Sequence, residues 1–209
     1  MPAPDSEVAL VVLHGYGANM HDLFPLWEIW QKDNRNWYFP NGSIPLSMGP
    51  YGGRSWTSID MAGLEKAMRE GKHRDLSDFI PAEYDMSMSQ LENFLLEIKA
   101  KHKKVVIGGF SQGAMCASHL AMSTKVSVDG LILLSGNLIS QSKFPATAHG
   151  IPFYQSHGTQ DPVLSLDGAR ALEKKLLSLG FTGELDVFSG GHEIPYQVIQ
   201  GVTEYLKRF

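Results

Sequence analysis

One stretch decides how this chain is read: Val105-Val106-Ile107-Gly108-Gly109-Phe110-Ser111-Gln112-Gly113-Ala114-Met115. Its apolar, β-branched start predicts a buried strand, and the small residues at its end predict a closely packed helix. Between them lies G-x-S-x-G, whose glycines permit a sharp strand-to-helix turn that leaves the serine exposed at the helix N-terminus. Ser111 is therefore a candidate nucleophile. The alternative is an ordinary turn with a helix-capping serine, which would explain Ser111 but not its partners.

A serine hydroxyl needs a positioned base, and that base needs an orienting group. Asp161 follows one strand pattern and His192 follows the next, which gives the chain order Ser, Asp, His. Both lie in loops after strands, at the sheet edge where parallel sheets build their sites. We therefore expect Ser111 as nucleophile, His192 as base and Asp161 as the residue that orients it.

Other titratable residues compete for these roles. His157 is an alternative base, but its place at a strand end favours a buried, hydrogen-bonded histidine. Glu193 is too close to His192 in sequence to orient it. The remaining histidines lack a strand-to-loop context and are predicted to be structural or on the surface; they are His21, His73, His102, His119 and His149.

Hydrolysis also requires an oxyanion hole, because negative charge grows on the carbonyl oxygen in the transition state. One donor is expected to be the backbone N–H of Gln112, directly after the nucleophile. The pattern His14-Gly15-Tyr16-Gly17 after the first strand points to the backbone N–H of Tyr16 as the second. A plain glycine turn or a dinucleotide loop would also carry these glycines, but a dinucleotide loop needs glycine where Met20 stands.

The rest of the chain alternates strand and helix patterns, which predicts one α/β domain over residues 1–209 with a mostly parallel sheet covered by helices on both faces. Strands are expected at residues 8–13, 37–39, 104–110, 128–134, 151–156 and 184–188. Ser87 and Gln90 predict a capping box that starts one helix. Further helices are expected at 166–179, before Gly180, and from Pro195 to the C-terminus. Residues 43–60 are predicted to form a loop over the site, and 65–78 an exposed helix with a mobile turn.

Composition narrows the function classes. The chain has 209 residues, 43% of them hydrophobic, and no apolar run approaches the roughly 20 residues of a membrane span. We therefore expect no integral membrane association. The net charge of −4 and the dispersed basic residues argue against nucleic-acid binding. The N-terminus does not read as a signal peptide, and the single cysteine, Cys116, excludes an internal disulfide, so a cytoplasmic location is expected. Metal-binding and nucleotide-binding motifs are absent from the sequence, so no metal and no organic cofactor are predicted.

Together these motifs resemble those of the phospholipase/carboxylesterase family, which includes the acyl-protein thioesterases. The matching pieces span the chain in the family's order: residues 13–17, 54–60, 109–113, 157–162 and 191–194. The resemblance implies an α/β-hydrolase fold without a large cap domain, the same triad, and a homodimer. It also places Trp56 and Val163 near the acyl chain. Thioesterase members tend to carry an aromatic residue where this chain has Gly136-Asn137-Leu138, so Asn137 and Leu138 are expected to limit a shorter acyl pocket.

The sequence therefore predicts a serine carboxylesterase that hydrolyses short to medium acyl esters through an acyl-enzyme intermediate. An acyl-protein thioesterase or lysophospholipase would use the same triad on a different small-molecule ester or thioester. A noncatalytic α/β-hydrolase scaffold is a third hypothesis, of another class, since fold alone does not give function. A scaffold predicts a broken triad or a blocked oxyanion loop, and the sequence has neither.

Overall fold

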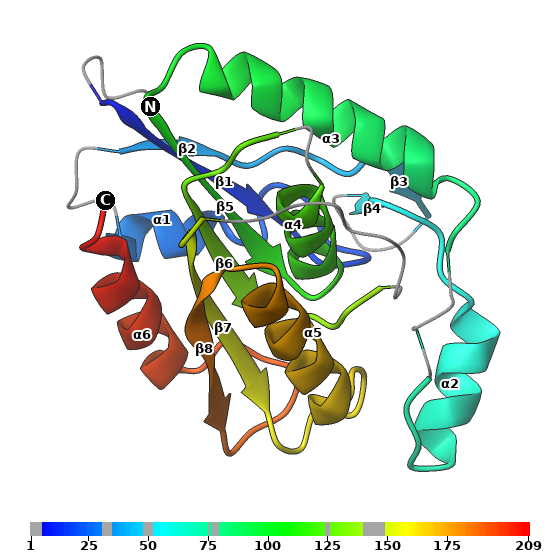
Figure 1. The fold of residues 1–209 in the computed structure, drawn as a ribbon. Helices are drawn as coiled ribbons and strands as arrows, with labels where there is room; N and C mark the ends of the chain where they lie inside the picture. The colour runs from blue at the N-terminus through cyan, green and yellow to red at the C-terminus, as the bar shows by residue number, and fades with distance from the viewer. Residues whose placement is uncertain are drawn as a thin grey trace.

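The computed structural model describes residues 6–30, 35–47, 52–74, 76, 80–123, 126–139 and 149–209. A six-stranded sheet lies at its centre, with strand order β2-β1-β5-β6-β7-β8 and every neighbouring pair parallel (Figure 1). The strands are β1 (Val8–Leu13), β2 (Asn36–Tyr38), β5 (Lys104–Phe110), β6 (Gly130–Leu134), β7 (Pro152–Gly158) and β8 (Thr182–Phe188). The predicted parallel sheet is confirmed, including its short strand near Trp37.

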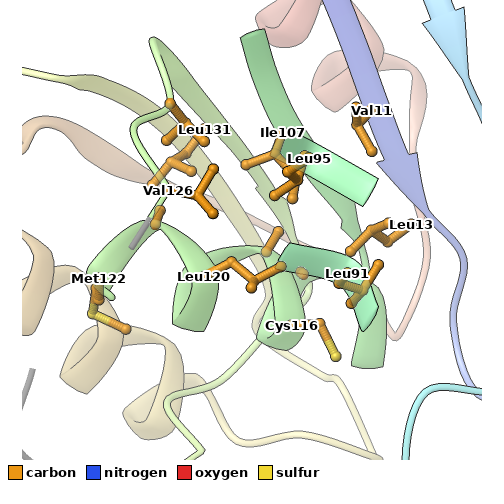
Figure 2. Packing of buried hydrophobic residues seen from close by; sticks show 14 of the residues in the cluster. Val11, Leu13, Leu91, Leu95, Ile107, Cys116, Leu120, Met122, Val126 and Leu131 are labelled. Atoms are coloured by element: carbon orange, nitrogen blue, oxygen red, sulfur yellow. The ribbon is translucent and has the colours of Figure 1, made fainter. Parts of the chain in front are cut away.

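Helices cover both faces of the sheet because alternate strand residues point to opposite sides. Along β1, Ala9 and Val11 join the cluster formed with α3 (Tyr84–Lys99), α4 (Gln112–Met122) and α5 (Leu166–Ser178). Val8 and Leu10 join the other cluster, with α1 (Phe24–Trp30) and α6 (Tyr196–Leu206). Figure 2 shows the first cluster, in which strand side chains meet Leu91 and Leu95 of α3 and Leu120 of α4. These two layers hold the sheet rigid under the loops at its carboxyl edge.

The start of α3 differs from the sequence prediction. The helix begins at Tyr84, so Ser87 lies inside it and is no cap. The Ser87 hydroxyl instead donates to the main-chain carbonyl of Trp56, and Ser87 is buried. The capping-box prediction was wrong because this serine serves a contact with a distant segment.

The segment before α3 is more ordered than a loop. Within residues 43–60, β3 (Ile44–Leu46) and β4 (Gly53–Ser55) pair as an antiparallel hairpin. The exposed helix predicted at 65–78 begins earlier, as α2 (Met61–Arg69), because the Asp60 carboxylate caps it by accepting from the N–H of Gly63 at 3.0 Å. Of the segment predicted to hold this helix and a mobile turn, residues 75, 77 and 78 lie outside the described residues.

The α2 helix stands apart from the layered body (Figure 1) and buries none of its residues.

The two C-terminal helices follow their predictions closely. Ser165 caps α5 by accepting from the N–H of Gly168 at 3.0 Å, and Pro195 directly precedes α6. Helix α1 was not predicted.

Candidate functional site

Ser111 lies at the tight turn between the central strand β5 and helix α4. Its backbone has φ 55° and ψ −120°, in the left-handed half of conformational space that non-glycine residues rarely adopt. Such a conformation costs on the order of 1–3 kcal/mol and persists only where the surroundings enforce it. Here the N–H of Ser111 donates to the carbonyl of Leu134 at 2.9 Å, so the neighbouring strand β6 fixes the turn.

The two glycines of the motif allow α4 to approach β1. A Cβ atom at Gly109 would lie 2.5 Å from the carbonyl oxygen of Leu13, and one at Gly113 would lie 2.1 Å from the same atom. Both distances are far inside van der Waals contact with backbone that cannot swing away. The spacing G-x-S-x-G is thus required by packing at this corner.

Gly113→Ala is therefore expected to destabilise the fold by about 1–3 kcal/mol, since it overpacks a closed backbone contact. For a chain of this size that lowers Tm by roughly 2–4 °C per kcal/mol, measurable by thermal unfolding. Gly191→Ala is the matched control, because the nearest atom to its added Cβ lies 3.9 Å away. Equal Tm values for the two variants would contradict the packing argument.

Asp161 and His192 form the tightest polar contact of the site. Nδ1 of His192 lies 2.6 Å from Oδ2 of Asp161, while Oδ1 accepts from the backbone N–H groups of Val163 and Leu164 at 2.8 and 2.9 Å. Burial by itself raises the pKa of the Asp161 carboxyl, but the hydrogen bonds from His192 and the two N–H groups outweigh it, so the net pKa is lowered. The ionised carboxylate can only accept, so Nδ1 carries the proton and Nε2 is left to act as a base.

His157 is placed behind this pair. Its side chain is fully buried, its Nε2 donates to the carbonyl of Leu164 at 3.0 Å, and the same atom lies 3.5 Å from Oδ2 of Asp161. Burial lowers the pKa of His157, which keeps it neutral near pH 7. This is the buried, hydrogen-bonded environment expected from the sequence. Glu193 accepts from the N–H of Gly191 at 3.1 Å, a local contact within its own loop.

Tyr16 and Gln112 follow the carboxyl ends of the adjacent strands β1 and β5, which pair Leu13 with Gly109. The N–H of Gln112 belongs to the first turn of α4, where backbone donors have no partner within the helix. The loop of Tyr16 is tied to β4: the N–H of Gly17 donates to Arg54 at 2.9 Å, and the N–H of Arg54 donates to Ala18 at 2.7 Å. The backbone N–H groups of Tyr16 and Gln112 thus belong to neighbouring segments that are held in place.

Two side chains that support this loop were missed in the sequence analysis. His14 is buried, its Nε2 accepts from the N–H of Gly42 at 2.9 Å, and its Nδ1 therefore donates to the carbonyl of Gly15 at 2.7 Å. The Gln112 amide accepts from the N–H of Trp56 at 3.0 Å and donates to the carbonyl and hydroxyl of Thr57 at 2.9 Å each. The only sequence signal was their position inside the two motifs, which says nothing of these partners.

A largely apolar cavity of about 270 Å³ opens onto the site. Ser111, His192, Tyr16 and Gln112 all line it, so the four predicted residues share one space. Val163, which the family resemblance places near the acyl chain, also lines this cavity. Most of the remaining wall is apolar and consists of Ile59, Met61, Leu64, Leu76, Pro81, Met115, Ile139 and Leu164, with Thr57 and Arg74 as polar members.

Three residues predicted to bind substrate lie elsewhere. Trp56 is only 3% exposed and is not part of the cavity wall, and its Nε1 donates to the carbonyl of His14 at 2.8 Å. Asn137 is equally buried and faces Gly168 at the start of α5, and Leu138 packs on the core. Of this segment, the next residue, Ile139, lines the cavity in place of Asn137 and Leu138.

The comparisons with known proteins bear on this arrangement. The family model described as Phospholipase/Carboxylesterase matches residues 2–209, which is nearly the whole chain. The chain belongs to the phospholipase/carboxylesterase family. The chain is 26% identical in sequence to acyl-protein thioesterase 1 of Candida albicans. The alignment covers 97% of this chain and 92% of the length of that protein.

Among solved structures the chain is similar to esterase PE8, with 23% identity, a TM-score of 0.79, and 99% and 94% of the two chains covered. It is also similar to the Bacillus cereus carboxylesterase, with 21% identity, a TM-score of 0.77, and 100% and 92% covered. These likenesses confirm the α/β-hydrolase fold that the phospholipase/carboxylesterase family resemblance implied, and the described residues contain no large cap domain.

His73 makes a contact with the site that the sequence did not predict. Nε2 of His73, predicted to be structural or on the surface, donates to the main-chain carbonyl of Asp161 at 2.8 Å. This hydrogen bond joins the segment after α2 to the loop that carries Asp161.

Within the described residues, no three His, Cys, Asp or Glu side chains are grouped to hold a metal ion. Nor does that part of the chain contain a helix long and apolar enough to cross a membrane.

Proposed function

We propose that this protein is a serine carboxylesterase that hydrolyses short to medium acyl esters through an acyl-enzyme intermediate. The observation that carries the proposal is the shared cavity: Ser111 and His192 line it together, and His192 is held by the buried, ionised carboxylate of Asp161. Nucleophile, base and orienting acid are the three parts that acyl transfer by serine requires.

In the proposed reaction the hydroxyl of Ser111 attacks the ester carbonyl carbon while Nε2 of His192 accepts its proton. The N–H groups of Gln112 and Tyr16 stabilise the negative charge that forms on the carbonyl oxygen. His192 then gives the proton to the leaving alcohol. Water enters by the same steps and releases the acid and the free Ser111 hydroxyl. Asp161 stays ionised throughout and holds the imidazole of His192 in the required orientation.

The size and wall of the cavity support a limited acyl length. The cavity measures about 270 Å³ and most of its wall is apolar, so it offers a bounded apolar space for an acyl chain. Each methylene buried against apolar wall contributes about 0.8 kcal/mol, or about fourfold in binding, and the gain ends where the wall ends. The proposed limit on acyl length thus rests on this cavity rather than on Trp56 or Asn137, which are not part of its wall.

On a series of 4-nitrophenyl esters, kcat/KM is expected to rise with acyl length through short chains, peak at medium chains and fall for palmitoyl. Ile59→Trp should fill part of the cavity and move the optimum to shorter chains, because Ile59 is part of its wall. Ile29→Trp is the matched control, since Ile29 is an exposed residue of α1, outside the cavity wall. A palmitoyl optimum in the unchanged protein would overturn the length limit.

An acyl-protein thioesterase or lysophospholipase is the second candidate, and it is favoured by the acyl-protein thioesterase relatives. It would use the same residues, so only substrates separate the two. Matched oxygen and sulfur esters of one acid, assayed side by side, give the preference directly. A protein that binds these esters without turning any of them over would instead support the noncatalytic scaffold. The cytoplasmic location and the homodimer stay predictions from the sequence.

A further inference from the structure

Among the described residues of the cavity wall, one side chain is permanently charged: Arg74, which lies among mainly apolar neighbours. Arg74 follows α2 and is half-buried. A guanidinium is charged at every physiological pH and carries five N–H donors in a rigid fork. Placing this charge against a mainly apolar wall is therefore unfavourable unless a hydrogen-bond acceptor lies within its reach.

Within the described part of the chain, the guanidinium of Arg74 has few hydrogen-bond acceptors. Its Nη1 donates to the main-chain carbonyl of Asp60 at 3.2 Å on the exposed side. Its Nε is shielded from solvent and has no hydrogen-bond partner. No carboxylate of the described residues forms an ion pair with it, although Arg69 and Lys72 nearby pair with Glu65 and Glu70. The donors that remain belong to a side chain that lines the same cavity as Ser111.

We propose that Arg74 is a specificity residue that binds an anionic group of the substrate, a carboxylate or a phosphate. This inference rests on the proposed esterase function and adds a substrate class to it. Arginine binds both anions through paired, charge-assisted hydrogen bonds, and the apolar surroundings strengthen them by excluding water. A neutral ester offers the guanidinium no ionised acceptor, whereas an ester with an anion within its reach offers one.

The anion could reach Arg74 from either side of the ester bond, so two pairs of probes are needed. The acyl pair is the mono-4-nitrophenyl ester of hexanedioic acid against 4-nitrophenyl hexanoate. The alcohol pair is the butanoyl ester of glycerol 3-phosphate against butanoylglycerol. Within each pair the reacting ester is matched and only the charge differs. The measured quantity is the ratio of kcat/KM for the anionic probe to that for the neutral probe.

In the unchanged protein this ratio is expected to exceed one in at least one pair, and in Arg74→Met it should fall by about tenfold to a hundredfold, the range of hydrogen bonds to charged groups. The pair that responds identifies the side from which the anion comes. Arg74→Lys keeps the charge but loses the fork, so an intermediate ratio is expected. Arg74→Gln is a second charge-removing variant if the methionine variant is unstable.

Arg69→Met is the matched control, because it removes the same side chain from the same segment at a position exposed to solvent and outside the cavity wall. A purely structural tie between Arg74 and Asp60 would lower both rates together and leave the ratio unchanged. An unchanged ratio in Arg74→Met and Arg74→Gln, or a preference for the neutral probe in both pairs, overturns the inference while the esterase proposal stands. Failure of all four esters overturns the proposed function, and this inference with it.

Discussion

Replacing Ser111 with alanine is expected to lower ester turnover by about 10⁵- to 10⁶-fold, as removal of a serine nucleophile does when its partners act as a unit. The Ser111 hydroxyl supplies the oxygen that bonds to the acyl carbon, and alanine has no such group. Alanine has the same Cβ as serine and meets the same positive φ, so the backbone conformation at the turn is equally enforced. The variant should therefore unfold at nearly the same temperature.

The measurement combines turnover with labelling. An alkyl phosphonate should modify the unchanged protein at Ser111, as shown by peptide mass mapping, and should leave Ser111→Ala unlabelled. Ser58→Ala is the control, since Ser58 is an exposed serine close by, whose hydroxyl donates to Glu83 at 2.7 Å. Retention of most activity by Ser111→Ala would sink the triad.

Asp161→Asn is expected to lower kcat by about 10⁴-fold, because an amide cannot hold the imidazole in the orientation and tautomer that the carboxylate imposes. In Asp161 one oxygen meets His192 and the other meets two backbone N–H groups, so an amide nitrogen would face a donor on either side. Asp167→Asn, on the solvent side of α5, is the matched control and should keep full activity.

The lowered pKa of Asp161 fixes the sense of the pH dependence. Because the folded pKa lies below the ordinary value near 3.9, the ionised form stabilises the fold at neutral pH, and this contribution is lost only as pH falls below about 4. Asp161 therefore stays charged from pH 5 to 9. The rise of kcat/KM with pH should follow a histidine, the only side chain that ordinarily titrates between pH 5 and 8. A flat profile with chemistry rate-limiting would argue against a histidine base.

Much of the fold was predictable because its signals are local. Buried strands read as apolar runs, α5 is bounded by Ser165 and Gly180, and the elbow needs glycines where the chain has them. The order Ser111, Asp161, His192 could be read because each residue follows its own strand. Local pattern is sufficient where an element is specified by its own residues.

The misplaced residues depend on contacts between distant segments. Ser87 looked like a helix cap, yet its partner is the carbonyl of Trp56, and Trp56 looked like a substrate contact, yet it is held under the loop by His14 and Gln112. Helix α1 carries Pro25 in its first turn, a start signal that was not used. The cavity wall around Arg74 could not be predicted, because it joins residues from the segment after β4, from α4 and from the loop after β7.

The pairing of β1 with β5 also bears on how the molecule assembles. Tyr16 and Gln112 become neighbours only when these two strands, far apart in the chain, align in the register that sets Leu13 beside Gly109. Parallel pairings of this kind close long loops and are slow steps of folding. Ser111 then needs β6 at its side, and His192 needs the loop after β7. A fragment of the chain that ends before His192 lacks the proposed base, so esterase activity is expected only after the chain has been made through the loop that follows β8.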